Sequence, residues 1–290
     1  MSESGRRRVF VGMHDNDLVA DCWGDPHAAA VVFLHGGGQT RHAWGGTAAR
    51  IAAAGWHAIS VDLRGHGESA WTEHYERRDF GGDVVCIVDQ LGTKPMLVGA
   101  SLGGNSALFA EDMKPGGLCA ALVLVDIAPR TNPAGVERII NFMRNGAEGF
   151  ATIEDAADAV AAYLRERSRP KDVSGLRKNL RQRADGRWYW HWDPRFLDRT
   201  AAGRERDALE LEAAAARLTT PTLLVRGGKS DVLTENGIEA FRALVPHAQF
   251  ADIAGAGHMV AGDKNDAFTD AILTFAATLE GTGRQPEPSA

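Results

Sequence analysis

The sequence is short of cysteine and of long apolar runs, and both shortages exclude classes of protein. Its three cysteines, Cys22, Cys86 and Cys119, are widely spaced and odd in number, which fits neither a disulfide framework nor a zinc site of C-x-x-C pairs. No stretch approaches the ~18 consecutive apolar residues of a membrane span, and the arginines at positions 6–8 precede no signal-peptide-like apolar segment. We therefore expect a cytoplasmic protein with free thiols, no metal site, no cofactor and no membrane partner.

An excess of basic residues is also missing. Lys and Arg number 32 against 38 Asp and Glu, which gives a formal net charge of −6, and the isoelectric point is near 5.9. Proteins that bind nucleic acid carry a basic footprint, so we expect no such partner. The 290 residues, 44% of them hydrophobic, are enough for one large domain or for a core domain with an insertion.

Short apolar runs alternate with helical patterns along most of the chain, which predicts an α/β fold with a mostly parallel, eight-stranded type of sheet and helices on both faces. Residues 9–12 and 18–23 flank a turn and are predicted to form an antiparallel hairpin at the sheet edge. Six further runs are predicted to be strands: residues 29–34, 56–63, 95–100, 120–126, 222–226 and 249–253. The first of them is apolar throughout, as is typical of a strand buried on both faces. Helices are predicted over residues 44–54, 83–91, 105–112 and 267–279.

The alternation stops between Asp126 and Thr222. Residues 129–218 are mostly helical in pattern and rich in charge, and a single crossover between two strands needs far fewer residues. We interpret this stretch as a mainly helical cap inserted into a core made of residues 1–128 and 219–280. The alternative is a set of crossover helices that belong to the core. Residues 281–290, rich in Gly, Pro and Ser, are expected to be a disordered tail.

The strongest chemical signal is the G-A-S-L-G run at residues 99–103. A predicted strand precedes it and a predicted helix follows, which is the context of a G-x-S-x-G nucleophile elbow. The glycines leave room for a sharp, strained turn on which the serine stands. This motif predicts Ser101 as a nucleophile.

A second glycine-rich segment, H-G-G-G at residues 35–38, ends another buried strand. Its backbone N–H groups could stabilise the oxyanion of a tetrahedral intermediate. We expect the N–H of Gly37 to act together with that of Leu102, and Gly38 is an alternative to Gly37. The segment is not a nucleotide phosphate loop, because G-x-x-x-x-G-K-[ST] is absent. For His35 we expect a structural role.

A serine hydroxyl needs a base, and a base histidine needs an acid to orient it. His258 follows the last predicted strand, after small residues that leave its imidazole room to reach a site. Two aspartates compete for the acid: Asp231 lies in the loop after the strand 222–226, and Asp126 ends the strand before the insertion. We predict Asp231, with Asp126 as the alternative. The aspartate that is not the acid should cap a helix or form an ion pair within a loop.

The chain order Ser101, Asp231, His258 resembles the nucleophile, acid and histidine order of the α/β-hydrolase superfamily. The run D-L-R-G-H-G-E-S at residues 62–69 is similar to the D-x-R-G-x-G-x-S turn of its capped members. Epoxide hydrolases and haloalkane dehalogenases of this superfamily have aspartate at the elbow, so Ser101 argues against both. The resemblance implies a capped serine hydrolase, similar to carboxylesterases, that cleaves a carboxylic ester through an acyl-enzyme.

Three of the seven tryptophans, Trp188, Trp190 and Trp192, lie close together in the predicted cap. They are predicted to line a pocket for a small-molecule substrate with an apolar or aromatic group, and the alternative is that they form the core of the cap itself. Other activities fit the same residues. They are hydrolysis of a C–C bond in a ring-cleavage product, a cofactor-free oxygenase that uses a His–Asp pair, and a non-enzymatic ligand receptor.

Overall fold

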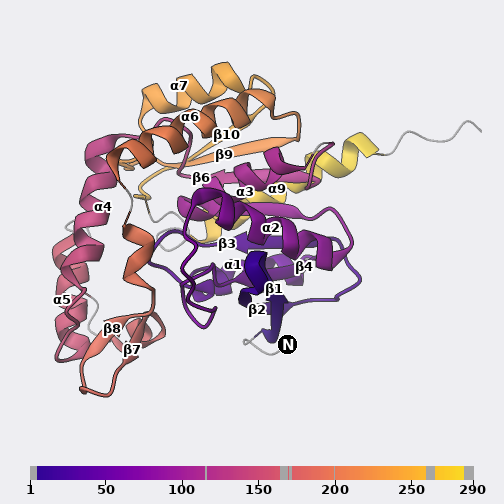
Figure 1. Ribbon diagram of the computed structural model, residues 1–290. Helices are drawn as coiled ribbons and strands as arrows, with labels where there is room; N and C mark the ends of the chain where they lie inside the picture. Colours follow the sequence, from indigo (N-terminus) through magenta and orange to yellow (C-terminus); the bar gives the residue numbers. More distant parts are fainter. Residues whose placement is uncertain are drawn as a thin grey trace, which may run out of the picture.

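The computed structural model describes residues 5–114, 116–163, 169, 172–198, 200–258 and 265–283. An eight-stranded sheet runs through its centre (Figure 1). In sheet order the strands are β1 (Arg6–Val11), β2 (Asp17–Trp23), β4 (His57–Val61), β3 (Ala30–Leu34), β5 (Met96–Ala100), β6 (Ala121–Val125), β9 (Thr222–Gly227) and β10 (Gln249–Ile253). β2 is antiparallel to both β1 and β4, and all other neighbours are parallel. The prediction of a mostly parallel sheet with an antiparallel hairpin at one edge is confirmed.

Each face of the sheet packs against its own layer of helices. Along β3, Val31 and Phe33 join one apolar cluster while Val32 and Leu34 join the other, because successive side chains of a strand point to opposite faces. The first cluster includes side chains of α1 (Gly45–Ala53) and α9 (Asn265–Gly283). The second includes side chains of α2 (Arg77–Leu91), α3 (Leu102–Met113), α6 (Ala201–Arg217) and α7 (Glu235–Leu244).

Several helices differ from their predicted ranges. α2 begins at Arg77, six residues early, because Glu76 and Asp79 form a reciprocal capping box. α7 was not predicted, although its N-cap Thr234 accepts a hydrogen bond from the N–H of Gly237. α9 continues to Gly283, inside the predicted tail, of which residues 284–290 lie outside the described part of the chain. No helix among the described residues is long and apolar enough to cross a membrane.

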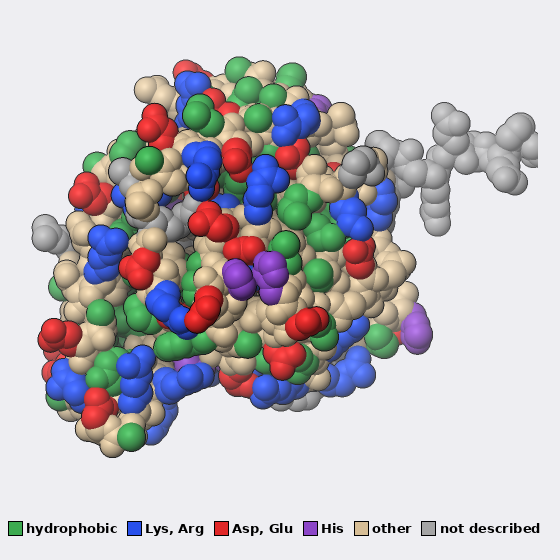
Figure 2. Space-filling model, in the orientation of Figure 1, with side chains coloured by type: hydrophobic (Ala, Val, Ile, Leu, Met, Phe, Trp, Pro, Cys, Tyr) green, Lys and Arg blue, Asp and Glu red, His purple; other side chains and the backbone are tan. Residues whose placement is uncertain are grey.

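The insertion after β6 extends beyond one end of the strands (Figure 1). Its described residues contain two α-helices, two short 3-10 helices and a small antiparallel hairpin: α4 (Pro133–Asn145), α5 (Ile153–Tyr163), η3 (Ser174–Asn179), β7 (Leu180–Gln182), β8 (Trp188–Trp190) and η4 (Pro194–Leu197). Its closing helix, α6, packs against α3 and α7 of the core. The part that stands apart from the core is therefore shorter than the predicted cap. We use the word cap for residues 133–198. Acidic and basic side chains are interspersed over the face shown in Figure 2.

Candidate active site

Ser101 occupies a strained turn between β5 and α3. Its φ is 46° and its ψ is −111°, a conformation that residues with a side chain rarely adopt. The neighbouring glycines are required by close approach: a Cβ on Gly99 would lie 2.5 Å from the carbonyl carbon of Gly103, and a Cβ on Gly103 would lie 2.3 Å from the Leu34 oxygen. The partly exposed serine therefore stands on a turn with the geometry of a nucleophile elbow.

His258 contacts a buried carboxylate at the end of the next strand. Its Nδ1 lies 2.6 Å from Oδ2 of Asp126, which is fully buried at the end of β6. A carboxylate only accepts hydrogen bonds, so Nδ1 carries the proton and Nε2 is left to act as a base. Asp126 also accepts the N–H of Gly227 at 3.0 Å and the hydroxyl of Ser230. Three donors thus hold this carboxylate in one orientation.

The prediction of Asp231 as the acid is wrong. Its side chain is half exposed, its carboxylate pairs with Arg138 of α4, and its carbonyl accepts a hydrogen bond from Asn132. Asp231 thereby joins the loop after β9 to the start of the cap. The alternative, Asp126, takes the position beside His258 because β6 is the strand adjacent to β5, which carries Ser101.

Two backbone donors near Ser101 have no protein partner in the described ranges. The N–H of Gly36 donates to Oε1 of Gln39, and the N–H of Gly38 donates to Nε2 of His66. The N–H groups of Gly37 and Leu102 have no such acceptor among the described residues. This arrangement supports the pair predicted for an oxyanion and argues against Gly38.

Two buried histidines hold the loops around these donors. Nδ1 of His35 donates to the carbonyl of Gly36 and its Nε2 accepts the N–H of Leu63. Burial lowers the pKa of His35 to about 4. Burial, and then the neighbouring His35, lower the pKa of His66 to about 3, and Nδ1 of His66 donates to the carbonyl of Arg64. Both rings are therefore neutral at pH 7 and act as structural links, as expected for His35.

The turn at residues 62–69 is a docking surface for the cap, a role that the sequence did not reveal. The N–H of Gly67 donates to the carbonyl of His191 at 2.7 Å, and the N–H of Asp193 donates to the carbonyl of Gly65 at 2.7 Å. A Cβ on Gly67 would lie within 2.4 Å of three atoms of the Asp62 carboxylate. The motif therefore places backbone groups where the cap can hydrogen-bond to them.

Three cap side chains cover the glycine loop. A Cβ built on Gly37 would lie 3.6 Å from the ring of Phe196. One built on Gly38 would lie 2.7 Å from Cε of Met143 and 3.4 Å from the ring of Trp192. These side chains come from η4, α4 and the segment after β8. They form an apolar wall beside the proposed oxyanion donors, and Phe196 and Met143 were not among the predicted site residues.

The three cap tryptophans have different surroundings. Trp190 is buried, and its ring stacks on Trp192 with the centroids 5.1 Å apart, between Phe142 and Phe150. Trp190 thus belongs to the core of the cap. The Trp188 ring is half-buried and lies under the guanidinium of an arginine from η3. Of the three, Trp192 is the one that contacts the glycine loop.

Residues 29–264 match the family described as alpha/beta hydrolase fold, and the chain belongs to this family. It is 31% identical to the esterase Rv0045c of Mycobacterium tuberculosis, over 86% of this chain and 83% of that protein. It is 28% identical to the sn-1-specific diacylglycerol lipase ABHD11 of Mus musculus, over 88% and 83% of the two chains.

Solved structures show the same fold. The crystal structure of E-2-(acetamidomethylene)succinate hydrolase superposes with a TM-score of 0.83 at 23% identity, covering 94% of this chain and 99% of that one. A structure of the M. tuberculosis esterase gives a TM-score of 0.73 at 27% identity, covering 96% and 93%. The family and these relatives make the chain a hydrolase of the α/β fold.

Proposed function

We propose that this protein hydrolyses carboxylic esters through an acyl-enzyme on Ser101. The observation that carries the proposal is the placement of Ser101 and of the His258–Asp126 pair at the ends of adjacent strands. Ser101 stands on the strained turn after β5, and His258 is held by Asp126 at the end of the adjacent strand. The backbone ties these strand ends together, because the N–H of Ser101 donates to the carbonyl of Val125.

The chemistry follows from the protonation pattern of this pair. Oγ of Ser101 attacks the ester carbonyl while Nε2 of His258 accepts the serine proton, and Asp126 stabilises the imidazolium through Nδ1–H. The oxyanion of the tetrahedral intermediate accepts hydrogen bonds from the N–H groups of Gly37 and Leu102. The imidazolium then protonates the leaving alcohol. Water repeats the sequence on the acyl-enzyme and releases the acid.

The apolar wall supports a substrate with an apolar acyl group. Phe196, Met143 and Trp192 contribute ring and thioether surface beside the proposed oxyanion donors, and apolar surface near a reacting group favours apolar ligands. The names of the two curated relatives, an esterase and a diacylglycerol lipase, point in the same direction. We expect esters of medium-chain or aromatic acids to be better substrates than acetate esters.

A serine-directed fluorophosphonate tests the nucleophile directly. The wild-type protein should form a covalent adduct that mass spectrometry locates on Ser101, and it should hydrolyse p-nitrophenyl esters. Ser101→Ala should remain folded, form no adduct and lose at least ~10³-fold in kcat/KM, because only binding and oxyanion stabilisation remain. Near-full ester turnover by this variant would show that another group is the nucleophile.

The same experiment separates the oxygenase alternative. A cofactor-free oxygenase would use His258 and Asp126 to deprotonate an organic substrate and would not need Ser101. In that case Ser101→Ala would keep its activity toward such a substrate under oxygen, and the phosphonate would not inhibit it. Hydrolysis of a C–C bond would instead keep the dependence on Ser101, with turnover of a dienol ketone in place of simple esters.

A further inference from the structure

The hydroxyl of Ser230, in the loop after β9, makes three hydrogen bonds. Its oxygen accepts the backbone N–H of Val232 at 3.1 Å and that of Leu233 at 3.2 Å, and its proton is donated to Oδ2 of Asp126. A serine hydroxyl has one proton to donate and two lone pairs with which to accept. Because the two N–H groups occupy both lone pairs, the proton has one direction left, toward the carboxylate of Asp126.

The loop that carries this hydroxyl is also fixed against the segment that leads to His258. The backbone N–H of Lys229 donates to the carbonyl of Ala256 at 2.8 Å. A Cβ on Gly227 would lie 2.2 Å from the carbonyl oxygen of Gly257, so the two backbones are in direct contact. One loop thus positions both the hydroxyl that contacts the acid and the backbone that carries the base.

Among the described residues, His258 is the only ionisable side chain that hydrogen-bonds to Asp126. The charged side chains of the neighbouring segments are exposed or have partners of their own: Lys229, Arg226 with Glu235 and Asp252, Asp231 with Arg138, and Arg130 with Glu212. The charge on Asp126 is therefore controlled by its three donors, and two of these, Nδ1–H of His258 and the Ser230 hydroxyl, share the oxygen Oδ2.

The Ser230 hydroxyl stabilises one protonation state of the His258–Asp126 pair more than the other. When His258 is neutral, the buried carboxylate carries a full negative charge, and a hydrogen bond to it is strong. When His258 is protonated, the imidazolium neutralises much of that charge at the same oxygen, so the hydroxyl contributes less. The hydroxyl therefore favours the neutral histidine, which is the state that accepts the proton of Ser101.

We propose that Ser230 is a positioning residue that keeps His258 neutral, and so able to act as a base, at lower pH than the His258–Asp126 pair alone would allow. The hydroxyl acts through Asp126, because its proton and both of its lone pairs are already engaged. For its effect on turnover, this inference rests on the ester hydrolysis proposed above.

The cap begins on the same loop. The N–H of Asn132, which is the N-cap of α4, donates to the carbonyl of Val232 at 2.9 Å, and its side-chain amide donates to the carbonyl of Asp231 at 3.0 Å. A change in the loop therefore reaches the cap as well as Asp126, and an experiment on Ser230 needs controls for both.

The pH dependence of kcat/KM for p-nitrophenyl butyrate tests the role of Ser230. In Ser230→Ala, the low-pH limb of the profile, where activity falls as His258 gains a proton, should move to higher pH by about half a unit or more, because the lost hydrogen bond has a charged acceptor. KM should stay within about twofold of wild type while kcat falls, because the hydroxyl does not contact the substrate. Ser230→Thr, which keeps a hydroxyl, should have the wild-type limb.

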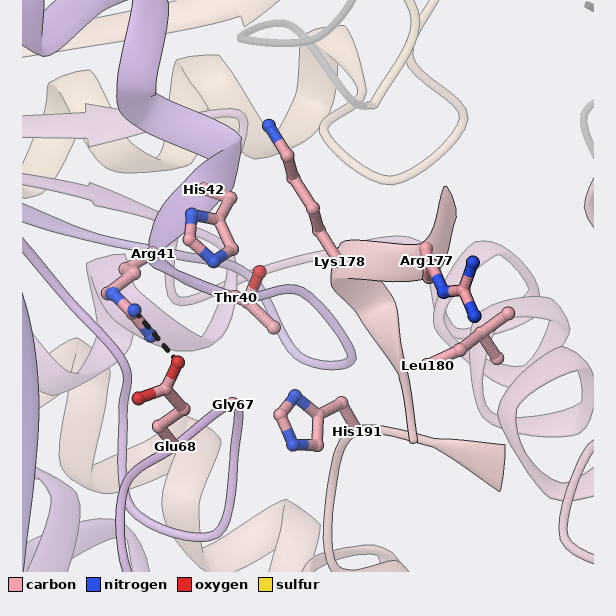
Figure 3. A pocket seen from close by; sticks show the side chains of 9 residues that line it. All are labelled: Thr40, Arg41, His42, Gly67, Glu68, Arg177, Lys178, Leu180 and His191. Atoms are coloured by element: carbon pink, nitrogen blue, oxygen red, sulfur yellow. Dashed lines mark hydrogen bonds and ion pairs between the residues drawn. The ribbon is translucent and has the colours of Figure 1, made fainter. Parts of the chain in front are cut away.

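Two control variants separate this effect from loosening of the loop or of the cap. Thr234→Ala removes the N-cap of α7, four residues further along the chain, where the hydroxyl oxygen accepts the N–H of Gly237. Thr40→Ala removes the hydrogen bond from Oγ1 of Thr40 to Asn179 at 3.2 Å, beside a cavity of about 180 Å³ where the cap meets the core (Figure 3). Both should lower Tm and leave the limb unchanged, because neither hydroxyl contacts Asp126.

Proton NMR of the Nδ1–H of His258, assigned by its loss in His258→Ala, follows the same titration without turnover. Its signal should titrate at higher pH in Ser230→Ala than in wild type. The proposal is overturned if the limb and the signal titrate alike in these two proteins, or if Thr234→Ala shifts them equally. If the wild-type protein does not hydrolyse esters but the signal still shifts in Ser230→Ala, the proposed function fails and the role of Ser230 stands.

Discussion

Replacing Asp126 with asparagine changes one atom of the carboxylate that His258 contacts, and the buried donors dictate how the new amide must sit. Gly227 donates its N–H to Oδ1, while His258 and Ser230 donate to Oδ2. An amide nitrogen facing the Gly227 N–H would leave two buried donors opposed, at a cost of about 1–3 kcal/mol. The amide oxygen therefore takes the Oδ1 position and the amide nitrogen faces His258.

This orientation forces the wrong tautomer on the histidine. An amide N–H that points at Nδ1 of His258 requires Nδ1 to be an acceptor, so the ring proton moves to Nε2. Nε2 then cannot accept the proton of Ser101. We expect Asp126→Asn to lower kcat/KM for p-nitrophenyl butyrate by about 10⁴-fold, the loss seen when the acid of a serine triad is replaced in this way.

The matched variant is Asp231→Asn, which removes the other predicted acid. Its half-exposed carboxylate pairs with Arg138 on the surface, so kcat/KM should stay within about threefold of wild type, as expected for an exposed ion pair. Circular dichroism should show both variants folded. If Asp126→Asn kept more than a tenth of the activity while Asp231→Asn lost it, the assignment of the acid would be refuted.

Two further predictions concern stability and selectivity. The folded-state pKa of His35 is about 4 and that of His66 about 3, both below the ordinary value of 6.5. As the pH falls below about 6.5, these histidines therefore bind protons in the unfolded chain but not in the folded chain. The free energy of unfolding should therefore drop by about 2 kcal/mol per histidine between pH 7 and pH 5, and urea unfolding that gives equal values at the two pH values would contradict this. Phe196→Ala should shift the preferred p-nitrophenyl ester toward longer or bulkier acyl groups, because it opens the wall beside Gly37. The control is Trp188→Ala, because Trp188 is a half-buried cap tryptophan that packs against Arg177. If wild type and Phe196→Ala had identical chain-length profiles, the Phe196 ring would not contact the acyl group.

Local features were predictable because they depend on neighbouring residues. A buried strand is recognisable from its apolar run, and seven of the eight strands lie within two residues of their predicted starts and ends; β1 begins three residues earlier. The elbow was also recognisable, because a serine at φ 46° needs glycines at positions 99 and 103, where a Cβ would collide with backbone. The start of α2 and the whole of α7 were missed although their caps were present in the sequence.

The sequence by itself determined the class of fold and predicted the proposed nucleophile and base, because each of these features depends on a short motif next to a recognisable strand. The choice of acid was left to the tertiary structure. Asp126 and Asp231 both follow buried strands, and only the order β5, β6, β9 in the sheet makes Asp126 the carboxylate that reaches His258. The same is true of the cap. Whether a tryptophan packs inside the cap, as Trp190 does, or reaches the glycine loop, as Trp192 does, depends on how the cap docks onto the 62–69 turn through backbone hydrogen bonds. Such contacts join residues more than a hundred positions apart, and no local pattern encodes them.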